Sequence, residues 1–194
     1  MNSEISEDIS VESQALLLKI ARTSIESHLK KQKPPKFEIT DQNLLQKRGA
    51  FVTLHKRGQL RGCIGYVLPY KPLHQTVAEM AVAAATEDPR FPSVTLNEMN
   101  EIDIEISALS TLKKIESIEE LEVGKHGLYM KQGVFSGLLL PQVATDYGWN
   151  RKEFLEHTCR KAGLPKDAWK DKKTEISIFS AQVFGEEENV KRNT

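Results

Sequence analysis

Several features that decide the class of a protein at once are scarce or missing in this sequence. Its 194 residues include only two cysteines, Cys63 and Cys159, which form no spacing pattern. Two isolated cysteines argue against a disulfide framework and fit a reducing cytosol. Basic and acidic side chains number 27 each, so the chain lacks the basic excess expected of a nucleic-acid binder.

Long hydrophobic runs are missing too. The longest apolar stretches, such as residues 81–85 and 138–140, fall far short of the roughly 20 residues that span a membrane. The first ten residues are acidic and polar, unlike the basic and apolar regions of a signal peptide. We therefore expect a cytoplasmic protein that associates with neither membranes nor nucleic acid.

What the sequence does contain is the composition of an ordinary globular domain. Apolar residues make up 39% and charged residues 28% of it, and a chain of this length folds without help from a metal ion or a disulfide. No group of histidine, cysteine or carboxylate residues has a zinc or iron spacing, and no glycine pattern matches a phosphate loop. We expect no metal site and no cofactor.

Hydrophobic periodicity and turn residues predict a mixture of helices and strands. Ser10, Asp41 and Asn150 are placed to cap helices at their first residues. The predicted helical segments are residues 10–31, a short turn around 44–45, 73–86, 141–147 and 150–163. The predicted strands are residues 50–56, 59–65, 102–109, 127–131, 134–140 and 174–184. Because helices and strands do not alternate strictly, the pattern favours an α+β fold with a mixed or antiparallel sheet and flanking helices.

The first two strands are predicted to form a hairpin that turns at Arg57 and Gly58. With a two-residue loop, opposed residues share a face. One face then carries Ala50, Val52, Leu54, Arg61, Cys63 and Gly65. His55 would lie on the other face, away from Cys63. Both faces are largely apolar, so we expect the hairpin to be central in its sheet, and a shift of one residue would reverse the faces of one strand.

Cys63 lies in the hexapeptide Leu-Arg-Gly-Cys-Ile-Gly at residues 60–65. Gly62 and Gly65 indicate close approach of another backbone or of a ligand, because they have no Cβ. Arg61 is about 6.6 Å from Cys63 along the strand, where its charge would favour a thiolate. The alternative is that Cys63 is a small buried residue, packed where nothing larger fits.

Outside the hexapeptide, several side chains are candidates for chemistry. Arg90 lies between two prolines, which restrict the backbone and suit it to hold a carboxylate or phosphate; it is otherwise an arginine that ties a loop to backbone carbonyls. His126 precedes a glycine at the start of a strand and is either a general base or ligand contact or a turn residue. Asp103 and Glu105 share a strand face, which suits acid–base chemistry and is equally what an exposed sheet face produces.

Taken in order along the chain, the hexapeptide, the segment around Arg90 and the segment around His126 resemble those of the AMMECR-type domain proteins. In archaea and bacteria these proteins are the A component of the AmmeMemoRadiSam gene neighbourhood. The resemblance covers residues 16–184, nearly the whole chain. It is carried by the hexapeptide, Asp88-Pro89-Arg90-Phe91-Pro92, Ile104-Glu105-Ile106-Ser107, Gly124-Lys125-His126-Gly127-Leu128, residues 137–144, Gly148-Trp149 and Lys161-Ala162-Gly163-Leu164. One departure is Ser93, where the family commonly has a second proline; it affects only the loop.

The resemblance implies an α+β protein with a larger lobe, a smaller lobe and a cleft between them. The domain would span residues 10–185, with flexible termini at 1–9 and 186–194. The residues that the family shares map here to Arg61, Gly62, Cys63, Gly65, Arg90, Ser107, His126 and Pro141. The gene neighbourhood implies two partners, a Memo-like protein and a radical S-adenosylmethionine enzyme, and shared work on a small molecule or on a protein modification.

Two functions from different classes follow. In the first, the protein is a binding or adaptor module whose ligand contacts come from Arg61, Gly62, Gly65, Arg90 and Ser107. In the second, it is an enzyme or enzyme subunit that uses Cys63 as nucleophile or redox thiol and His126 as acid–base group, with Arg61 and Arg90 holding an anionic group. Under both, we expect Arg61, Cys63, Arg90 and His126 to meet at one cleft.

Overall fold

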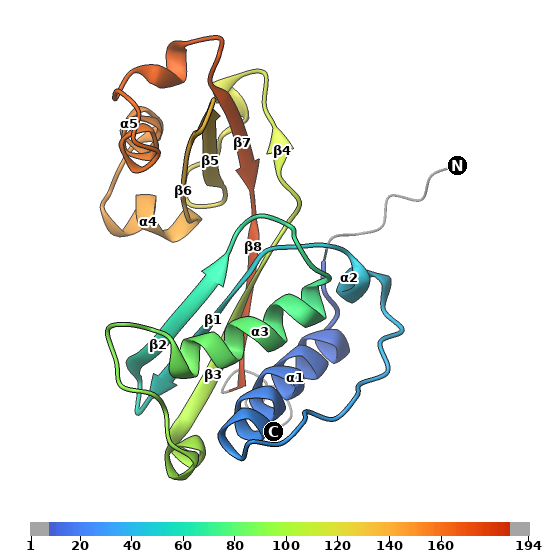
Figure 1. Cartoon of the computed structure of the whole chain (residues 1–194). Coiled ribbons are helices and arrows are strands. Elements are labelled where there is room, and N and C mark those ends of the chain that lie inside the picture. Colours follow the sequence, from blue (N-terminus) through green and yellow to red (C-terminus); the bar gives the residue numbers. More distant parts are fainter. Residues whose placement is uncertain (1–7, 187–194) are drawn as a thin grey trace. The chain divides into compact units, whose positions relative to one another are not determined.

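The computed structural model describes residues 8–186 and divides the chain into two compact units (Figure 1). Of the described residues, 8–109 and 182–186 form the first unit, and 110–181 form the second. Each unit combines a four-stranded sheet with helices, which confirms the α+β class. Apart from residues 8, 9 and 186, the termini expected to be flexible lie outside the described residues.

The first unit is built around a sheet of order β2-β1-β3-β8, in which β1 runs antiparallel to both of its neighbours. Its elements are α1 (Val11–Leu29), α2 (Gln42–Leu45), β1 (Ala50–Lys56), β2 (Gln59–Tyr66), α3 (Leu73–Thr86), the 3-10 helix η1 (Leu96–Glu101), β3 (Ile102–Leu109) and β8 (Ala181–Gly185). Ser10 and Asp41 cap α1 and α2 as predicted, each accepting a backbone N–H two or three residues on.

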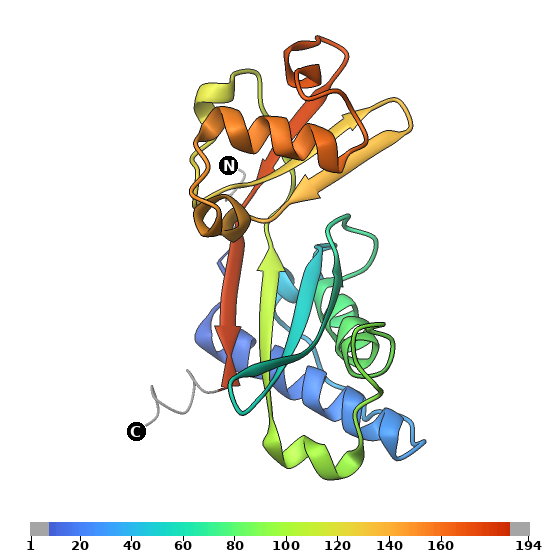
Figure 2. The same cartoon turned by 90° about the vertical axis from the view of Figure 1, so that its left-hand side faces the viewer.

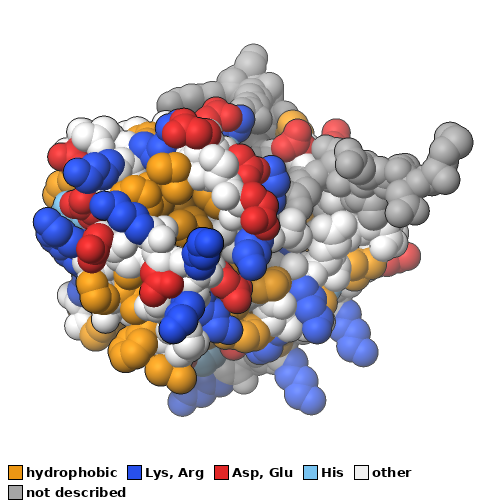
Figure 3. All heavy atoms as spheres, turned by 90° about the horizontal axis from the view of Figure 1, so that it is seen from above, with side chains coloured by type: hydrophobic (Ala, Val, Ile, Leu, Met, Phe, Trp, Pro, Cys, Tyr) orange, Lys and Arg blue, Asp and Glu red, His pale blue; other side chains and the backbone are white. Residues whose placement is uncertain are grey.

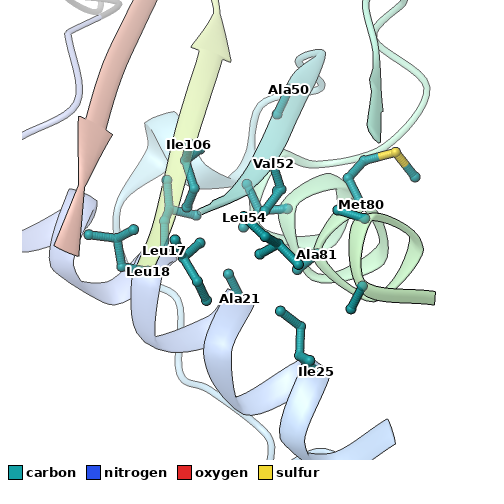
Figure 4. Packing of buried hydrophobic residues seen from close by; sticks show 14 of the residues in the cluster. Leu17, Leu18, Ala21, Ile25, Ala50, Val52, Leu54, Met80, Ala81 and Ile106 are labelled. Carbon is teal, nitrogen blue, oxygen red and sulfur yellow. The ribbon is translucent and has the colours of Figure 1, made fainter. Parts of the chain in front are cut away.

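Helices α1 and α3 cover one face of this sheet (Figures 1 and 2). Their apolar side chains pack against β1 and β3 in one core cluster, part of which is shown in Figure 4. The fully buried members include Leu17, Ala21 and Ile25 of α1, Val52 and Leu54 of β1, Ala81 of α3 and Ile106 of β3. The opposite side of the sheet, here called the outer face, carries the alternate residues of β1, namely Phe51, Thr53 and His55, and their partners on β2 and β3.

The turn of the hairpin is where the sequence places it, but the faces predicted for β2 are wrong. Arg57 and Gly58 both have positive φ, and Lys56 pairs with Gln59 across them, the geometry of a two-residue hairpin turn. A bulge then shifts the register beside Leu54, so that Leu54 pairs with Gly62 and Thr53 pairs with Cys63. The extra residue in β2 reverses its later faces, which puts Cys63 and Gly65 on the outer face.

The hairpin is also less central than predicted. Of its two strands, only β1 is interior, because β2 forms an edge of the sheet. The close approach inferred from the hexapeptide glycines is confirmed at Gly62, where a Cβ would lie 2.2 Å from the carbonyl oxygen of Ala84 in α3. At Gly65 a Cβ would lie 2.4 Å from the ring of Phe51 and from the Ala50 carbonyl oxygen. A side chain at either position would therefore force its neighbours to shift.

The second unit has a sheet of order β4-β7-β5-β6, with antiparallel pairing throughout. Its elements are β4 (Lys113–Lys114), η2 (Ile118–Glu120), β5 (Gly127–Gln132), β6 (Phe135–Leu139), α4 (Pro141–Asp146), α5 (Arg151–Lys161), η3 (Ala168–Lys170) and β7 (Glu175–Phe179). Helix α5 packs on β5 and β6 and buries Phe154, Leu155 and Cys159. Figure 3 shows one face of the molecule, on which basic and acidic side chains are intermixed.

Two sequence predictions need correction here. The single strand predicted over residues 174–184 is two strands, β7 and β8, which are separated at Ser180 and belong to different sheets. The turn of the second hairpin lies at Gly133 and Val134, one residue later than predicted, because Gln132 pairs with Phe135. Within residues 8–186, no helix is both long and apolar enough to cross a membrane.

Candidate functional site

The segment that follows α3 runs back along β2 and contacts the hexapeptide. Asp88 and Arg90 bind the backbone of Cys63, while Pro92 and Glu98 bind the side chain of Arg61. Two of the sequence segments that carry the family resemblance therefore lie against one another in the first unit. An edge strand exposes unpaired N–H and C=O groups, and this segment covers part of that edge.

Asp88 is the centre of the first set of contacts. Its side chain is only 2% exposed, and its carboxylate accepts the backbone N–H of Cys63 at 2.9 Å and two guanidinium N–H groups of Arg90 at 2.7 and 2.9 Å. The hydrogen bonds from the Arg90 guanidinium, together with those from the backbone N–H groups of Cys63 and Arg90, hold the pKa of the Asp88 carboxyl well below its ordinary value. Arg90 also donates to the carbonyl oxygen of Cys63, so the pair binds β2 much as a neighbouring strand does.

Glu98 is the centre of the second set. Its carboxylate accepts from the Arg61 guanidinium at 3.2 and 3.3 Å, from Lys56 at 3.1 Å and from the backbone N–H of Thr95 at 3.0 Å. These donors, Arg61 first, lower the pKa of Glu98 to about 2. The remaining guanidinium nitrogen of Arg61 donates to the Pro92 carbonyl oxygen at 2.9 Å. Arg61 is thus bound to the loop, and its charge is balanced by Glu98.

The thiol of Cys63 lies beside a hydroxyl group. Cys63 is half-buried, and its Sγ is 3.2 Å from Oγ1 of Thr53, which donates to it. Thr53 in turn pairs with Glu105 of β3, so Cys63, Thr53 and Glu105 form one row across three strands of the outer face. The next row contains His55 and Asp103. His55 therefore shares a face with Cys63, contrary to the sequence prediction, because the bulge reverses β2.

The other predicted contact residues in the first unit occupy fixed positions on the same strands. Ser107 is buried on the outer face, where it pairs with Phe51, and Phe51 pairs on its other side with Gly65. Gly62 faces α3. The outer face thus combines a thiol, hydroxyl groups, carboxylates, an imidazole and an aromatic ring.

His126 belongs to the second unit and is held in a turn before β5. Its Nδ1 accepts the backbone N–H of Glu122 at 3.1 Å, and the backbone N–H of His126 donates to the Glu122 carbonyl oxygen at 2.9 Å. Burial, followed by the charge of Lys125, lowers the pKa of the imidazole, so the neutral ring predominates near pH 7. That His126 meets Cys63 and Arg90 at one cleft stays a prediction.

Sequence reasoning missed three residues that organise this region, namely Thr53, Asp88 and Glu98. Asp88 belongs to a quoted segment, and an aspartate before proline typically binds nearby backbone N–H groups. Glu98 follows Thr95 by three residues, the spacing of a capping box. No local pattern identifies Thr53, because its proximity to Cys63 depends on the bulge.

The comparisons with known proteins agree on one family. The family model AMMECR1 matches residues 18–184. A protein of Methanopyrus kandleri is 46% identical over 191 residues, which cover 94% of this chain and 92% of that protein, and one of Methanosarcina barkeri is 48% identical over 181 residues, covering 88% and 89%. The crystal structure of an uncharacterised protein from Pyrococcus horikoshii is similar with a TM-score of 0.75 and 41% identity, covering 89% of this chain and 90% of that one.

Proposed function

The chain belongs to the AMMECR1 family, and from this premise we propose that it is a cytoplasmic module that binds a small molecule or a partner protein through the outer face of its first sheet. In this proposal it works beside a Memo-like protein and a radical S-adenosylmethionine enzyme, the partners that the family's gene neighbourhood implies. Gly65, Ser107 and Cys63 lie on this surface, Arg61 and Arg90 hold the loop beside it, and Gly62 lets β2 pack closely on α3 behind it.

The observation that carries the proposal is that the two arginines near Cys63 are both paired with carboxylates of the first unit. Arg61 is bound by Glu98 and Arg90 by Asp88, so both arginines stabilise the loop along β2. The group beside the thiol is the Thr53 hydroxyl, which is too weak a base to activate a nucleophile. This arrangement favours a preformed surface over a nucleophile with its base.

Complex formation with the two named partners tests the proposal. We expect the purified chain to co-elute in size-exclusion chromatography with the Memo-like protein, the radical S-adenosylmethionine enzyme or both, taken from one organism. Thr53→Lys, which adds bulk and charge to the outer face, should abolish co-elution. Glu79→Lys, an exposed change on α3, is the matched control and should retain it. No complex with either partner, or equal loss in both variants, would contradict the partner form of the proposal.

A second function is favoured by one specific observation, the half-buried position of the Cys63 thiol beside a hydrogen-bond donor. In this alternative the chain is an enzyme or enzyme subunit, with Cys63 as nucleophile or redox thiol and His126 as acid–base group. In this alternative the Thr53 hydroxyl holds the Cys63 Sγ in a fixed position.

Alkylation by iodoacetamide, followed by mass spectrometry between pH 6 and 9, separates the two functions. A catalytic Cys63 should react faster than a model thiol at pH values well below about 8.5, the reference thiol pKa. If the chain is a binding module, Cys63 should react no faster than the model thiol. Cys159 is the internal control, because it is fully buried and burial raises the pKa of its thiol.

A further inference from the structure

A cavity of about 280 Å³ adjoins the row that contains Cys63 and Thr53. It is lined by His55 and Gly58 of the hairpin, Asp103, Ile104 and Glu105 of β3, and Val183, Phe184, Gly185 and Glu186 at the end of the chain's last strand. Glu105 belongs both to this lining and to the row of Cys63 and Thr53. The cavity is therefore part of the outer face.

The lining is rich in hydrogen-bond acceptors and contains three carboxylates. No lysine or arginine is among the described residues that line it. The charge of Glu186 is already balanced by Arg22, since its carboxylate accepts two hydrogen bonds from Arg22 at 2.6 and 2.7 Å and one from the backbone N–H of Ile104 at 2.9 Å. The side chains of His55 and Glu105, by contrast, take part in no hydrogen bond or ion pair with the described residues.

The arrangement suits an organic cation better than a metal ion. Asp103 and Glu105 are alternate residues of one strand, so their Cα atoms are about 6.6 Å apart. Among residues 8–186, no group of three histidine, cysteine or carboxylate side chains is arranged to hold a metal. An alkylammonium group offers three N–H donors on a point charge, and its carbon chain suits the apolar Val183 wall. The volume lies just below the usual range of small-molecule sites and so suits a small group.

We propose that this cavity binds the alkylammonium group of a small amine or of a lysine side chain, which pairs with the Glu105 carboxylate. The proposal deepens the proposed function, on which it rests, by giving the ligand class of the outer face. Half-buried carboxylates in a concave wall attract cations more strongly than exposed ones, because the surrounding protein screens them less than water does. A ligand held there reaches over Thr53 towards Cys63 along the row that the three strands form.

Titration of the full chain by two-dimensional amide NMR tests the proposal. The probes are n-butylamine and diaminobutane for free amines and Nα-acetyl-lysine-N-methylamide for a protein side chain; butanol and butyrate have similar size without the positive charge. We expect saturable shifts at His55, residues 103–105 and residues 183–185 with an amine probe, and at least ten-fold weaker binding in Glu105→Gln. Glu101→Gln is the matched control, since Glu101 pairs with Arg57 outside the cavity and should leave binding unchanged.

Absence of saturable shifts with all three amine probes would overturn the proposal, as would equal responses to butanol or butyrate, or undiminished binding in a folded Glu105→Gln. Binding of only the lysine derivative would assign the ammonium to a partner protein, and binding of the free amines would assign it to a small molecule. Partner co-elution without amine binding would refute only the ligand class. Amine binding without co-elution would leave the small-molecule form of the proposed function standing.

Discussion

At Gly62 the missing side chain lets β2 lie against the backbone of α3. A Cβ at this position would be 2.2 Å from the Ala84 carbonyl oxygen, and a backbone atom cannot move aside as the end of a flexible side chain does. Gly62→Ala should therefore destabilise the protein by about 1–3 kcal/mol through overpacking, lowering the Tm by several degrees. Gly62→Val should yield little soluble protein. Thermal and urea denaturation measure both effects.

Gly185 provides the control for this prediction. Its φ is not in the left-handed region, and an added Cβ would meet its nearest atom at 3.5 Å, an ordinary contact. Gly185→Ala should therefore change the Tm little. Equal effects of Gly62→Ala and Gly185→Ala would show that the approach of α3 to β2 does not restrict side-chain size.

Asp88 should make stability depend on pH through its lowered pKa. A carboxyl whose folded pKa lies below its unfolded value of about 3.9 stabilises the fold above that value and loses the contribution as pH falls towards the folded pKa. Asp88→Asn should cost about 1.5–3 kcal/mol at pH 7, because charge-assisted hydrogen bonds to Cys63 and Arg90 are weakened. The difference from wild type should shrink progressively below about pH 5.

Urea denaturation of both proteins at pH 7, 5, 4 and 3 measures this difference. The comparison with wild type isolates Asp88, because Glu98, whose pKa is also lowered, is present in both proteins. Asp146→Asn, on an exposed position of α4, should have little effect at any of these pH values. A penalty for Asp88→Asn that stays constant from pH 7 to pH 3 would refute the role of its charge.

Among the elements, the β1–β2 hairpin shows best what sequence patterns do and do not reveal. The turn residues and the bounds of β1 are as predicted, because turn chemistry and hydrophobic alternation are local properties. The bulge has no such local pattern, so the prediction placed Cys63 on the wrong face. The break at Ser180 was missed for a related reason, since both strands are apolar and only their sheet partners distinguish them.

In the candidate site, too, the sequence reveals some residues but not the contacts that hold them. Cys63, Arg61 and Arg90 stand out in the sequence because glycines and prolines surround them. That Asp88 and Glu98 hold these residues depends on a loop that returns to β2 after a whole helix. Contacts of this kind join residues more than 20 positions apart, and periodicity does not report them.

The hairpin turn itself offers a prediction at the scale of the element. Arg57 has a φ of 52°, which asparagine adopts at lower cost than arginine. Its ion pair with Glu101 involves a side chain that is 80% exposed, and such pairs contribute little. Arg57→Asn should therefore raise the free energy of unfolding by a few tenths of a kcal/mol, measured by urea denaturation. Arg57→Val, a β-branched residue at positive φ, should lower it. A lower free energy of unfolding in Arg57→Asn than in wild type would show that the ion pair outweighs backbone strain.

For the molecule as a whole, the decisive feature is that it contains two separate hydrophobic cores. All described members of one cluster belong to the first unit, and all those of the other belong to the second. A cavity in one core removes contacts only from residues of the same unit. Local stability is therefore expected to differ between the units, with each unit opening as its own cooperative segment.

Phe154→Ala and Leu17→Ala test this expectation, since both side chains are fully buried, one in each core. Phe154→Ala should cost about 3–5 kcal/mol and accelerate amide hydrogen exchange across β5, β7 and α5, while α1, β1 and α3 keep their wild-type protection. Leu17→Ala should give the converse pattern. Hydrogen exchange followed by mass spectrometry under native conditions reads out both variants. Acceleration spread equally over both units in either variant would show that the chain opens as one cooperative whole, because its two crossings near residues 109 and 181 couple the cores despite their separate side chains.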